Sequence, residues 1–275
     1  MTAPHSPAPM NLRLAALQMI SGPDVAANLA MAERLVDEAV AQGAQLVALP
    51  EYFPIIGAAD AERVAAREAF GRGPVQDWLA ATAQRHGLWI VAGSIPLAAS
   101  VPDKMRNASL LFNPAGECVA RYDKMHLFGF RKGSETYDEA AFIEAGDTPV
   151  AVDTPFGRIA LSICYDLRFP ELYRSLGPVD LILMPAAFTE TTGRAHWEIL
   201  LRARAIENQC YLLAVGQGGQ HPNGRVTHGN SMIIDPWGDI LDRKLKGPGV
   251  VMADLDHARL AEVRASLPAL AHRKL

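Results

Sequence analysis

One cysteine, Cys164, stands where a short apolar run gives way to a polar turn. The run from Ile159 to Ile163 has the pattern of a strand buried on both faces, and Pro170 suits the first turn of a following helix. A side chain on such a turn is held outward beside free backbone N–H groups, which suits a thiolate nucleophile with an oxyanion site. The alternative is a buried small hydrophobe, a common use of cysteine, and this stretch alone does not decide between the two.

Three charged residues elsewhere could serve the same chemistry. Glu51 follows a second apolar strand, and reactive side chains in α/β sheets gather at the carboxyl ends of strands. A carboxylate in a closed site can have its pKa raised enough to deprotonate a thiol. Lys124 could hold the charge of a tetrahedral intermediate, and Glu139 lies in the irregular segment beyond it. Each alone is usually a solvated loop charge, so the set is informative only if the fold brings its members together.

Strands and helices alternate along the chain and must position these residues. The first half predicts strands over 12–19, 45–49 and 88–92, helices over 24–41, 60–70 and 74–86, and a hairpin over 107–112 and 118–122. The second half predicts strands over 158–163, 180–184 and 211–215, helices over 170–176 and 194–208, and strands over 231–234 and 240–243.

The two halves resemble each other in sequence. QLVALP pairs with DLILMP, LWIVAG with YLLAVG, and NPAGE with DPWGD, in the same order along the chain. Buried strands share composition, but the common order favours duplication of one supersecondary unit. Alternating strands and helices predict parallel-type sheets with helices outside. We therefore expect an α/β fold, a four-layer α-β-β-α sandwich with two internally similar halves.

Three motifs resemble the nitrilase superfamily of carbon–nitrogen hydrolases: LPEYF around Glu51, RYDKMHLF around Lys124 and SICYDLRFPELY around Cys164. They occur in the expected order, and the resemblance extends over nearly the whole chain, from AALQM to LPALAHRKL. It implies the α-β-β-α sandwich and a catalytic triad of Glu51, Lys124 and Cys164. It also implies that Glu139 positions the lysine and the substrate, and that the backbone N–H of Tyr165 completes the oxyanion site. No cofactor and no metal are implied.

Within this superfamily, GRAHWEILLRARAIENQCY and HGNSMIIDPWG most resemble the branch of omega-amidases and deaminated-glutathione amidases, and GQGGQHPNGRVTHGNS is closer to the latter. The resemblance implies an amidase that hydrolyses a small carboxylate-bearing amide, similar to deaminated glutathione, to acid and ammonia through a cysteine thioester. The alternatives are an omega-amidase acting on α-ketoglutaramate, a nitrilase or N-carbamoyl hydrolase, acyl transfer to another amine, and a silent member that binds a metabolite or a partner protein. HLFGFRKGSETYDE lacks the acidic, Pro-Gly-containing stretch of many such amidases, which leaves substrate specificity open.

A carboxylate that enters a partly buried site needs a fixed cation, and arginine suits it through paired hydrogen bonds. Arg131 and Lys132 lie shortly after Lys124, and Arg194 begins the helix expected over 194–208. We expect these three cations to bind substrate, although each alone is more commonly a surface charge. The resemblance also implies a homodimer, or a larger homo-oligomer, across the helices expected over 170–176 and 194–208.

The composition narrows the partners and the compartment. The 275-residue chain has a net charge of −4, which predicts neither nucleic acid nor a membrane as a partner, and no apolar run approaches membrane-spanning length. Three scattered cysteines form no disulfide framework or zinc site, so we expect a reducing, cytoplasmic location, with Cys118 and Cys210 in the core. The Pro-rich residues 1–10 lack the apolar stretch of a signal peptide and are expected to be a flexible lead-in to a single domain over 11–275.

Overall fold

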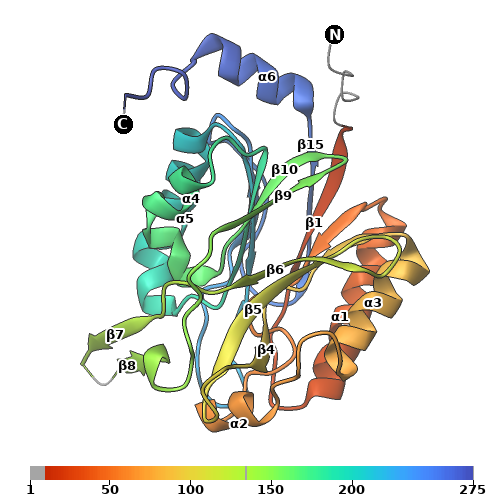
Figure 1. Ribbon diagram of the computed structural model, residues 1–275, viewed down its shortest axis with the longest axis vertical. Coiled ribbons are helices and arrows are strands. Elements are labelled where there is room, and N and C mark those ends of the chain that lie inside the picture. The colour runs from red at the N-terminus through yellow and green to blue at the C-terminus, as the bar shows by residue number, and fades with distance from the viewer. Residues whose placement is uncertain (1–9, 134, 275) are drawn as a thin grey trace.

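The computed structural model describes residues 10–133 and 135–274, which form four layers (Figure 1). Two β-sheets pack face to face at the centre. Helices α1 (Val25–Ala41) and α3 (Pro74–His86) cover one sheet, and helices α4 (Pro170–Ser175) and α5 (Glu190–Asn208) cover the other. The α-β-β-α sandwich predicted from the sequence is therefore confirmed. Of the expected lead-in over 1–10, only Met10 lies within the described residues, and its N–H donates to the carbonyl of Pro155 at 3.1 Å.

The first sheet has seven strands in the order β15-β1-β2-β3-β5-β4, with β6 paired to β5. Its strands are β1 (Leu12–Gln18), β2 (Leu46–Ala48), β3 (Trp89–Val91), β4 (Ile95–Ala98), β5 (Met105–Phe112), β6 (Cys118–Asp123) and β15 (Gly249–Leu255). Strands β1, β2 and β3 are parallel, whereas β5 runs antiparallel to β3. The last strand, β15, returns to pair antiparallel with the first, β1.

The second sheet repeats this plan with six strands in the order β14-β13-β12-β11-β10-β9. They are β9 (Val150–Thr154), β10 (Gly157–Leu161), β11 (Leu181–Ala186), β12 (Tyr211–Gly216), β13 (Ser231–Ile234) and β14 (Ile240–Lys244). Strands β10, β11 and β12 are parallel, and β13 is antiparallel to β12. The matched motifs lie in β2 and β11, in β3 and β12, and in the hairpins β5–β6 and β13–β14. The predicted similarity of the two halves is confirmed.

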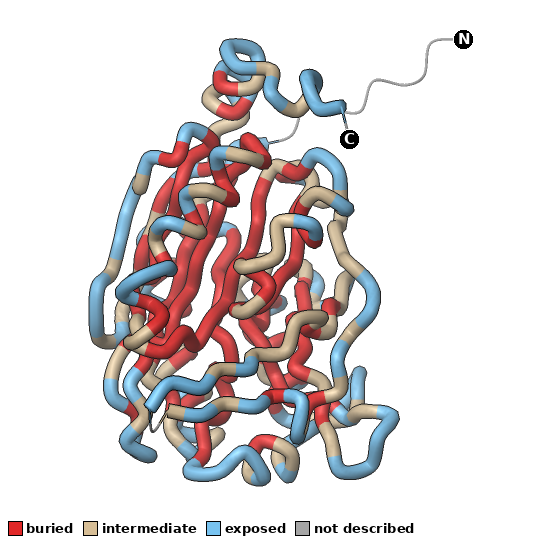
Figure 2. The backbone as a smooth tube through the Cα atoms, turned by 90° about the vertical axis from the view of Figure 1, so that its left-hand side faces the viewer, coloured by how far each residue is buried: buried red, intermediate tan, exposed pale blue. Residues whose placement is uncertain are grey.

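The central strands are buried on both faces, as Figure 2 shows along much of their length. In β1, Leu12 and Leu14 point into the core between the two sheets, whereas Ala15 and Leu17 pack under α1 and α3. Each such leucine is at most 1% exposed, and burying its side chain contributes about 2 kcal/mol. The rigid double sheet is thus the frame on which the strand ends are fixed.

Two helices differ from the boundaries that the sequence predicts. The helix expected over 60–70 ends early, as α2 (Asp60–Ala65). The following turn carries Glu68 to the start of α3, where its carboxylate accepts the N–H groups of Val75 and Gln76 at 2.7 and 3.2 Å. Glu68, which was expected inside the helix over 60–70, therefore caps the start of α3.

Helix α5 begins at Glu190, four residues before the predicted start, because the side chain of Thr189 accepts the N–H of Thr192 at 3.2 Å. Gly193 lies in the first turn of this helix, where a Cβ would collide with the side chain of His228.

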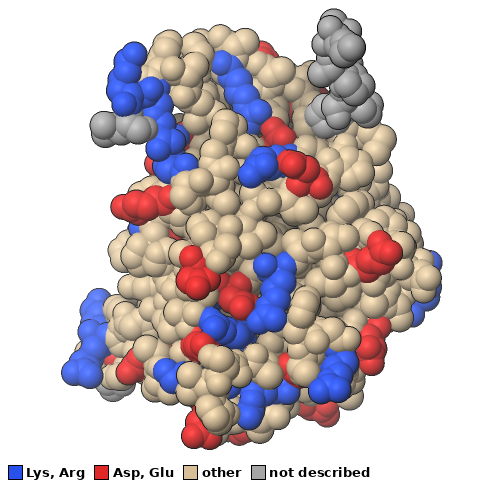
Figure 3. Space-filling model, in the orientation of Figure 1, with Lys and Arg blue, Asp and Glu red and all other residues tan. Residues whose placement is uncertain are grey.

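Several remaining elements surround the sheet ends. A hairpin of β7 (Gly129–Lys132) and β8 (Glu135–Asp138) precedes the 3-10 helix η1 (Glu139–Ala141), and α6 (His257–Ser266) follows β15. Cys210 is buried as expected, but Cys118 is exposed, so its placement in the core was wrong. In the described part of the chain, no helix is both long and apolar enough to cross a membrane. Basic and acidic side chains are interspersed on the face seen in Figure 3.

Candidate active site

The backbone holds Cys164 in an unusual conformation at the end of a strand. Strand β10 ends at Leu161, and Cys164 opens the 3-10 helix η2 (Cys164–Arg168) with φ of 50°, a left-handed value that few residues other than glycine adopt. The carboxylate of Asp166 closes this turn by accepting the N–H of Ile163 at 2.8 Å. Pro170 begins α4, as predicted. The thiol is thereby fixed at the sheet edge, and Cys164 is 8% exposed.

Glu51 lies at the matching place in the other sheet, three residues after β2. Tyr52, which follows it, is also left-handed, with φ of 55°, and its N–H donates to the Ser94 hydroxyl at 3.0 Å. Gly93 permits this turn, because a side chain there would collide with the carbonyl of Pro50. A similar strained turn therefore ends a central strand in each half of the molecule.

The carboxylate of Glu51 is held by groups from three distant segments. One oxygen accepts from Lys124 Nζ at 2.9 Å and from Asn107 Nδ2 at 3.0 Å. The other accepts the N–H of Ala187, just beyond β11, at 2.8 Å. Cys164 lines the same pocket as Glu51, and burial and then the charge of Glu51 raise the pKa of the Cys164 thiol. Glu51 therefore joins the two halves of the sandwich.

Lys124 is clamped between two carboxylates. It follows β6, its side chain is fully buried, and its Nζ lies 2.9 Å from Glu51 and 2.7 Å from Glu139. Glu139 in turn accepts the N–H of Phe128 at 2.7 Å and the hydroxyl of Tyr52 at 3.1 Å. The structure thus brings together the four side chains that the sequence singled out, Glu51, Lys124, Glu139 and Cys164.

Burial and mutual charge set the protonation of this cluster. Burial alone would raise the pKa of Glu51, but the adjacent Lys124 outweighs it and holds that pKa below its ordinary value. Burial would lower the pKa of Lys124, but Glu139 and Glu51 raise it well above its ordinary value. Burial and then the charge of Glu51 raise the pKa of Cys164 well above its usual range. The resting site therefore holds a carboxylate, an ammonium and a neutral thiol. The expected raised pKa for the carboxylate was wrong, because the lysine lies in direct contact with it.

Tyr165 is the second residue of η2. The first N–H groups of a helix have no partner within that helix, and the N–H of Tyr165, next in the chain to Cys164, is one of them. The ring of Tyr165 packs edge-on against Phe128 and Phe169, with centroids 5.2 and 5.3 Å away.

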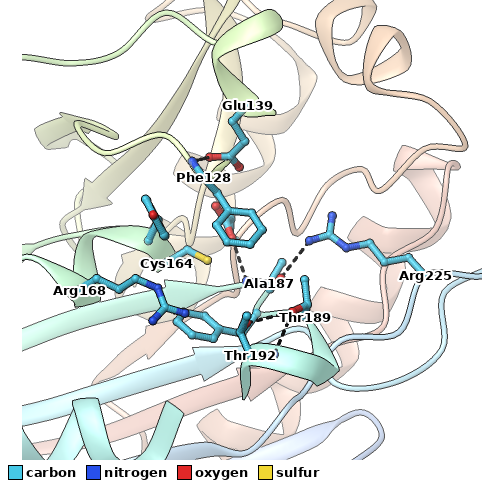
Figure 4. Close-up of a pocket in the computed structure, with 11 residues that line it drawn as sticks. Phe128, Glu139, Cys164, Arg168, Ala187, Thr189, Thr192 and Arg225 are labelled. Atoms are coloured by element: carbon cyan, nitrogen blue, oxygen red, sulfur yellow. Dashed lines mark hydrogen bonds between the residues drawn. The ribbon is translucent and has the colours of Figure 1, made fainter. Parts of the chain in front are cut away.

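A narrow pocket opens beside the thiol (Figure 4). Its volume of about 10 Å³ holds about one water molecule. Figure 4 shows Arg168 and Arg225 reaching into it from opposite sides. The remaining lining comes from aromatic, polar and charged residues and one alanine: Glu51, Phe128, Glu139, Tyr165, Ala187, Phe188, Thr189 and Thr192.

A second, larger cavity of about 380 Å³ adjoins this pocket, and Phe128, Glu139 and Arg225 line both. We call it the outer chamber. Its other walls are the segment 56–60, Arg63, the segment 136–138, Phe142 and Asn223. The structure therefore offers a tight space at the sulfur and a roomy one beyond Glu139.

The three cations expected to bind substrate line neither cavity. Arg131 and Lys132 are exposed on β7, and Arg194 is exposed on the outer side of α5. The arginines at the pocket are Arg168 and Arg225, which sequence reasoning missed. Arg168 stood in the cysteine motif, one helical turn after the sulfur, and that spacing was a usable signal.

Among the described residues, Glu33, Asp37 and His86 are close enough together to share an ion. They lie on α1 and α3 and line neither cavity. Glu33 is already bonded to the Trp78 indole N–H at 2.9 Å and to Arg85. This cluster is a surface salt-bridge group and offers no ligand to the thiol pocket.

Comparisons with known proteins agree with this geometry. Residues 13–265 match the family model described as carbon–nitrogen hydrolase. A deaminated glutathione amidase from Synechocystis sp. is 45% identical over 265 residues, covering 94% of this chain and 97% of that one. The structure of the Caenorhabditis elegans NitFhit protein superposes with a TM-score of 0.88 at 36% identity, covering 97% of this chain and 66% of that longer one. A variant of an amidase from Nesterenkonia sp. AN1, 29% identical with a TM-score of 0.77 and covering 94% of this chain and 98% of that one, shows acrylamide added to its active-site cysteine.

The fold is a double α/β sandwich with a cysteine just beyond a strand of one sheet and a glutamate just beyond a strand of the other. The chain belongs to the carbon–nitrogen hydrolase family.

Proposed function

We propose that this protein is a cysteine amidase in which Glu51, Lys124 and Cys164 form the catalytic triad and Glu139 positions the lysine. The observation that carries the proposal is the placement of Lys124 between two carboxylates that line the same pocket as the thiol of Cys164. This arrangement supplies a base, a nucleophile and a fixed positive charge within one buried site.

The first half of the reaction forms a thioester. Glu51 accepts the thiol proton as the sulfur attacks the amide carbon. The transfer is concerted with attack, because the thiol pKa is raised and the carboxylate pKa is lowered in the resting site. Lys124 Nζ and the N–H of Tyr165 hold the oxyanion. The proton then passes from Glu51 to the leaving nitrogen, the C–N bond breaks, and the amine departs.

The second half of the reaction hydrolyses the thioester and regenerates the free enzyme. Water enters the space that the amine has left and attacks the thioester carbon, while Glu51 accepts its proton, assisted by the charge on Glu139. The carboxylic acid leaves and Cys164 regains its proton. Atoms balance as one amide plus one water giving one acid and one amine.

The names of the relatives suggest the substrate. Deaminated glutathione is a secondary amide whose scissile nitrogen belongs to a cysteinyl residue, so its hydrolysis releases a peptide amine. Ammonia, the leaving group expected from the sequence, would come only from primary amides such as α-ketoglutaramate. Arg168 suits the carboxylate of the acyl half. It lines the thiol pocket with its guanidinium 5.6 Å from the Tyr165 ring and 5.4 Å from the Phe188 ring.

The test is a substrate panel with the purified full chain. We expect deaminated glutathione to give the highest kcat/KM, α-ketoglutaramate a lower one, and nitriles and N-carbamoyl amines little turnover. Release of the keto acid is measured, since it is common to both keto-acid amides. Preference for a nitrile, or failure to cleave any amide, would overturn the proposal. Acyl transfer would show as product formation only when a second amine is added.

We further propose a homodimer across α4 and α5. Exposed apolar side chains support it: Ile199 is 70% exposed and Ile206 47% on α5, and the neighbouring Trp237 is 52% exposed. A two-fold axis would place the same patch on both partners. A single catalytic domain over residues 11–275 working in the reducing cytosol is consistent with three free cysteines.

A further inference from the structure

The outer chamber is not needed to bind a primary amide or to release ammonia from it. Ammonia needs only the narrow space at the sulfur, whereas the chamber is far larger and its lining is continuous with the site through Phe128, Glu139 and Arg225. A cavity of this size that opens on a reacting bond is a binding site for part of the substrate.

The position of the carboxylates decides which half of the substrate enters. The leaving nitrogen must receive a proton, so it has to face Glu51 and its neighbour Glu139. Glu139 also lines the outer chamber, whereas Cys164 and Arg168 do not. A substituent on the nitrogen therefore continues past Glu139 into the chamber, and the acyl half extends toward Arg168.

The charged residues that line the outer chamber indicate the chemistry of that substituent. Three of its charged residues are already paired, because Arg63 bonds to Asp60 and Glu139 bonds to Lys124. A further carboxylate of the lining, Asp138, is exposed. Arg225 differs. Its Nη2 donates to the carbonyl of Ala187 at 3.0 Å, but its buried Nε has no hydrogen-bond partner among the described residues.

The Nη1 of Arg225 makes no hydrogen bond within the described residues either, and Arg225 lines both cavities, so this end of the guanidinium can donate charge-assisted hydrogen bonds to a carboxylate in the chamber. The Tyr137 ring lies 5.2 Å from the Arg225 guanidinium and steadies the group in place.

We propose that the outer chamber binds the leaving-amine half of the substrate, and that Arg225 selects amines carrying a carboxylate, such as a short peptide with a free C-terminus. This inference rests on the proposed amidase function. It adds that the two ends of the substrate are recognised on opposite sides of the sulfur, by Arg168 and by Arg225.

Three amides of one α-keto diacid test it on the full chain: the primary amide, an amide to a dipeptide with a free carboxylate, and an amide to the same dipeptide ending in carboxamide. For the wild type we expect kcat/KM to favour the free carboxylate over the carboxamide by roughly 10- to 100-fold, the range of one charge-assisted pair. In Arg225→Gln this ratio should fall to about one. The ratio is taken within each variant, so a general loss of activity cancels.

Arg67→Gln is the matched control. Arg67 is exposed, lies four residues from Arg63 and does not line the chamber, so the ratio should stay at the wild-type value. A wild type indifferent to the carboxylate would overturn the inference even if Arg225→Gln failed to fold. So would an Arg225→Gln variant that keeps the preference. Turnover of the primary amide without turnover of either dipeptide amide would refute the chamber's role alone, whereas no turnover of any amide would refute the amidase function itself.

Discussion

The hydroxyl of Tyr122 donates a 2.7 Å hydrogen bond to the carboxylate of Asp166, although the two residues belong to different halves of the sandwich. The same carboxylate accepts the N–H of His126 at 3.2 Å and lies 2.7 Å from its ring Nδ1, and it also accepts the N–H of Ile163. Asp166 is completely buried. It therefore ties the segment that carries Lys124 to the turn that carries Cys164.

Loss of this tie should slow the chemistry more than it weakens binding. In Asp166→Asn the amide oxygen cannot accept all of these bonds, so we expect kcat to fall about 10- to 100-fold with KM nearly unchanged. Alkylation of Cys164 by a small electrophile should slow in parallel, since the sulfur turn loosens. Tyr122→Phe, which removes one bond only, should show a smaller loss in both measurements. Normal kcat in Asp166→Asn would show that the tie is merely structural.

Removal of the central charge should affect both stability and rate. In Lys124→Met, kcat should fall about 10²- to 10³-fold, since one oxyanion donor is lost. Glu51 and Glu139 become buried carboxylates without a cation, which costs about 3–5 kcal/mol of the free energy of unfolding at neutral pH.

Without Lys124, burial raises the pKa of Glu51 above that of the unfolded chain, so this variant should be most stable at acid pH and lose stability as pH rises through the new value. Urea unfolding at pH 5 and pH 8 measures the difference. Equal stability of variant and wild type at pH 8 would contradict the placement of Lys124 between two buried carboxylates.

The protonation of the site predicts an unusually flat pH profile. The pKa of Glu51 is held below its ordinary 4.5, so this base stays ionised as pH falls toward that value. The pKa of Lys124 lies well above 10.5 and that of Cys164 well above 9.0, so neither loses its proton as pH rises. We therefore expect that titration of these three groups changes kcat/KM very little between about pH 5 and 9. Thiolate absorbance near 240 nm should likewise be absent at pH 7 in a comparison with Cys164→Ala, and a resting thiolate would contradict the concerted attack.

The proposed dimer predicts the effect of a charge on α5. Ile199→Asp places a carboxylate on the most exposed apolar residue of the patch, so the dimer should dissociate while the fold stays intact. Light scattering at micromolar concentration measures the mass. A wild type that is monomeric, or an Ile199→Asp variant that remains dimeric, would place the interface elsewhere.

Much of the architecture could be predicted because buried strands have a strong local signal. QLVALP and DLILMP were recognisable as strands, and their shared order predicted two similar halves. Non-local pairing was not predictable in the same way. Strand β15 joins β1 across 230 residues of chain, and Glu68 caps a helix that begins six residues later. Neither partner is marked by local periodicity.

The same distinction between local and non-local signals applies to the candidate site. Residue types at strand ends marked Glu51 and Cys164, and the family motifs added Lys124 and Glu139, all of which the fold brings together. The cationic residues of the pocket were harder to predict, because the sequence does not show whether an arginine side chain points into the pocket or toward solvent. Arg131 and Arg194 lie outside the pocket, whereas Arg225 reaches it from a long irregular loop between β12 and β13. The lowered pKa of Glu51 was also hidden, since it depends on a contact across 73 residues.

The most direct test of the account is the mass of the enzyme during turnover. Wild-type protein mixed with deaminated glutathione and quenched in acid within milliseconds to seconds should carry one added acyl group, mapped by peptide mass spectrometry to Cys164. Cys164→Ala should remain folded, carry no adduct and release no keto acid. Full turnover by Cys164→Ala, or an acyl group on any other residue of the wild type, would contradict the proposed thioester mechanism.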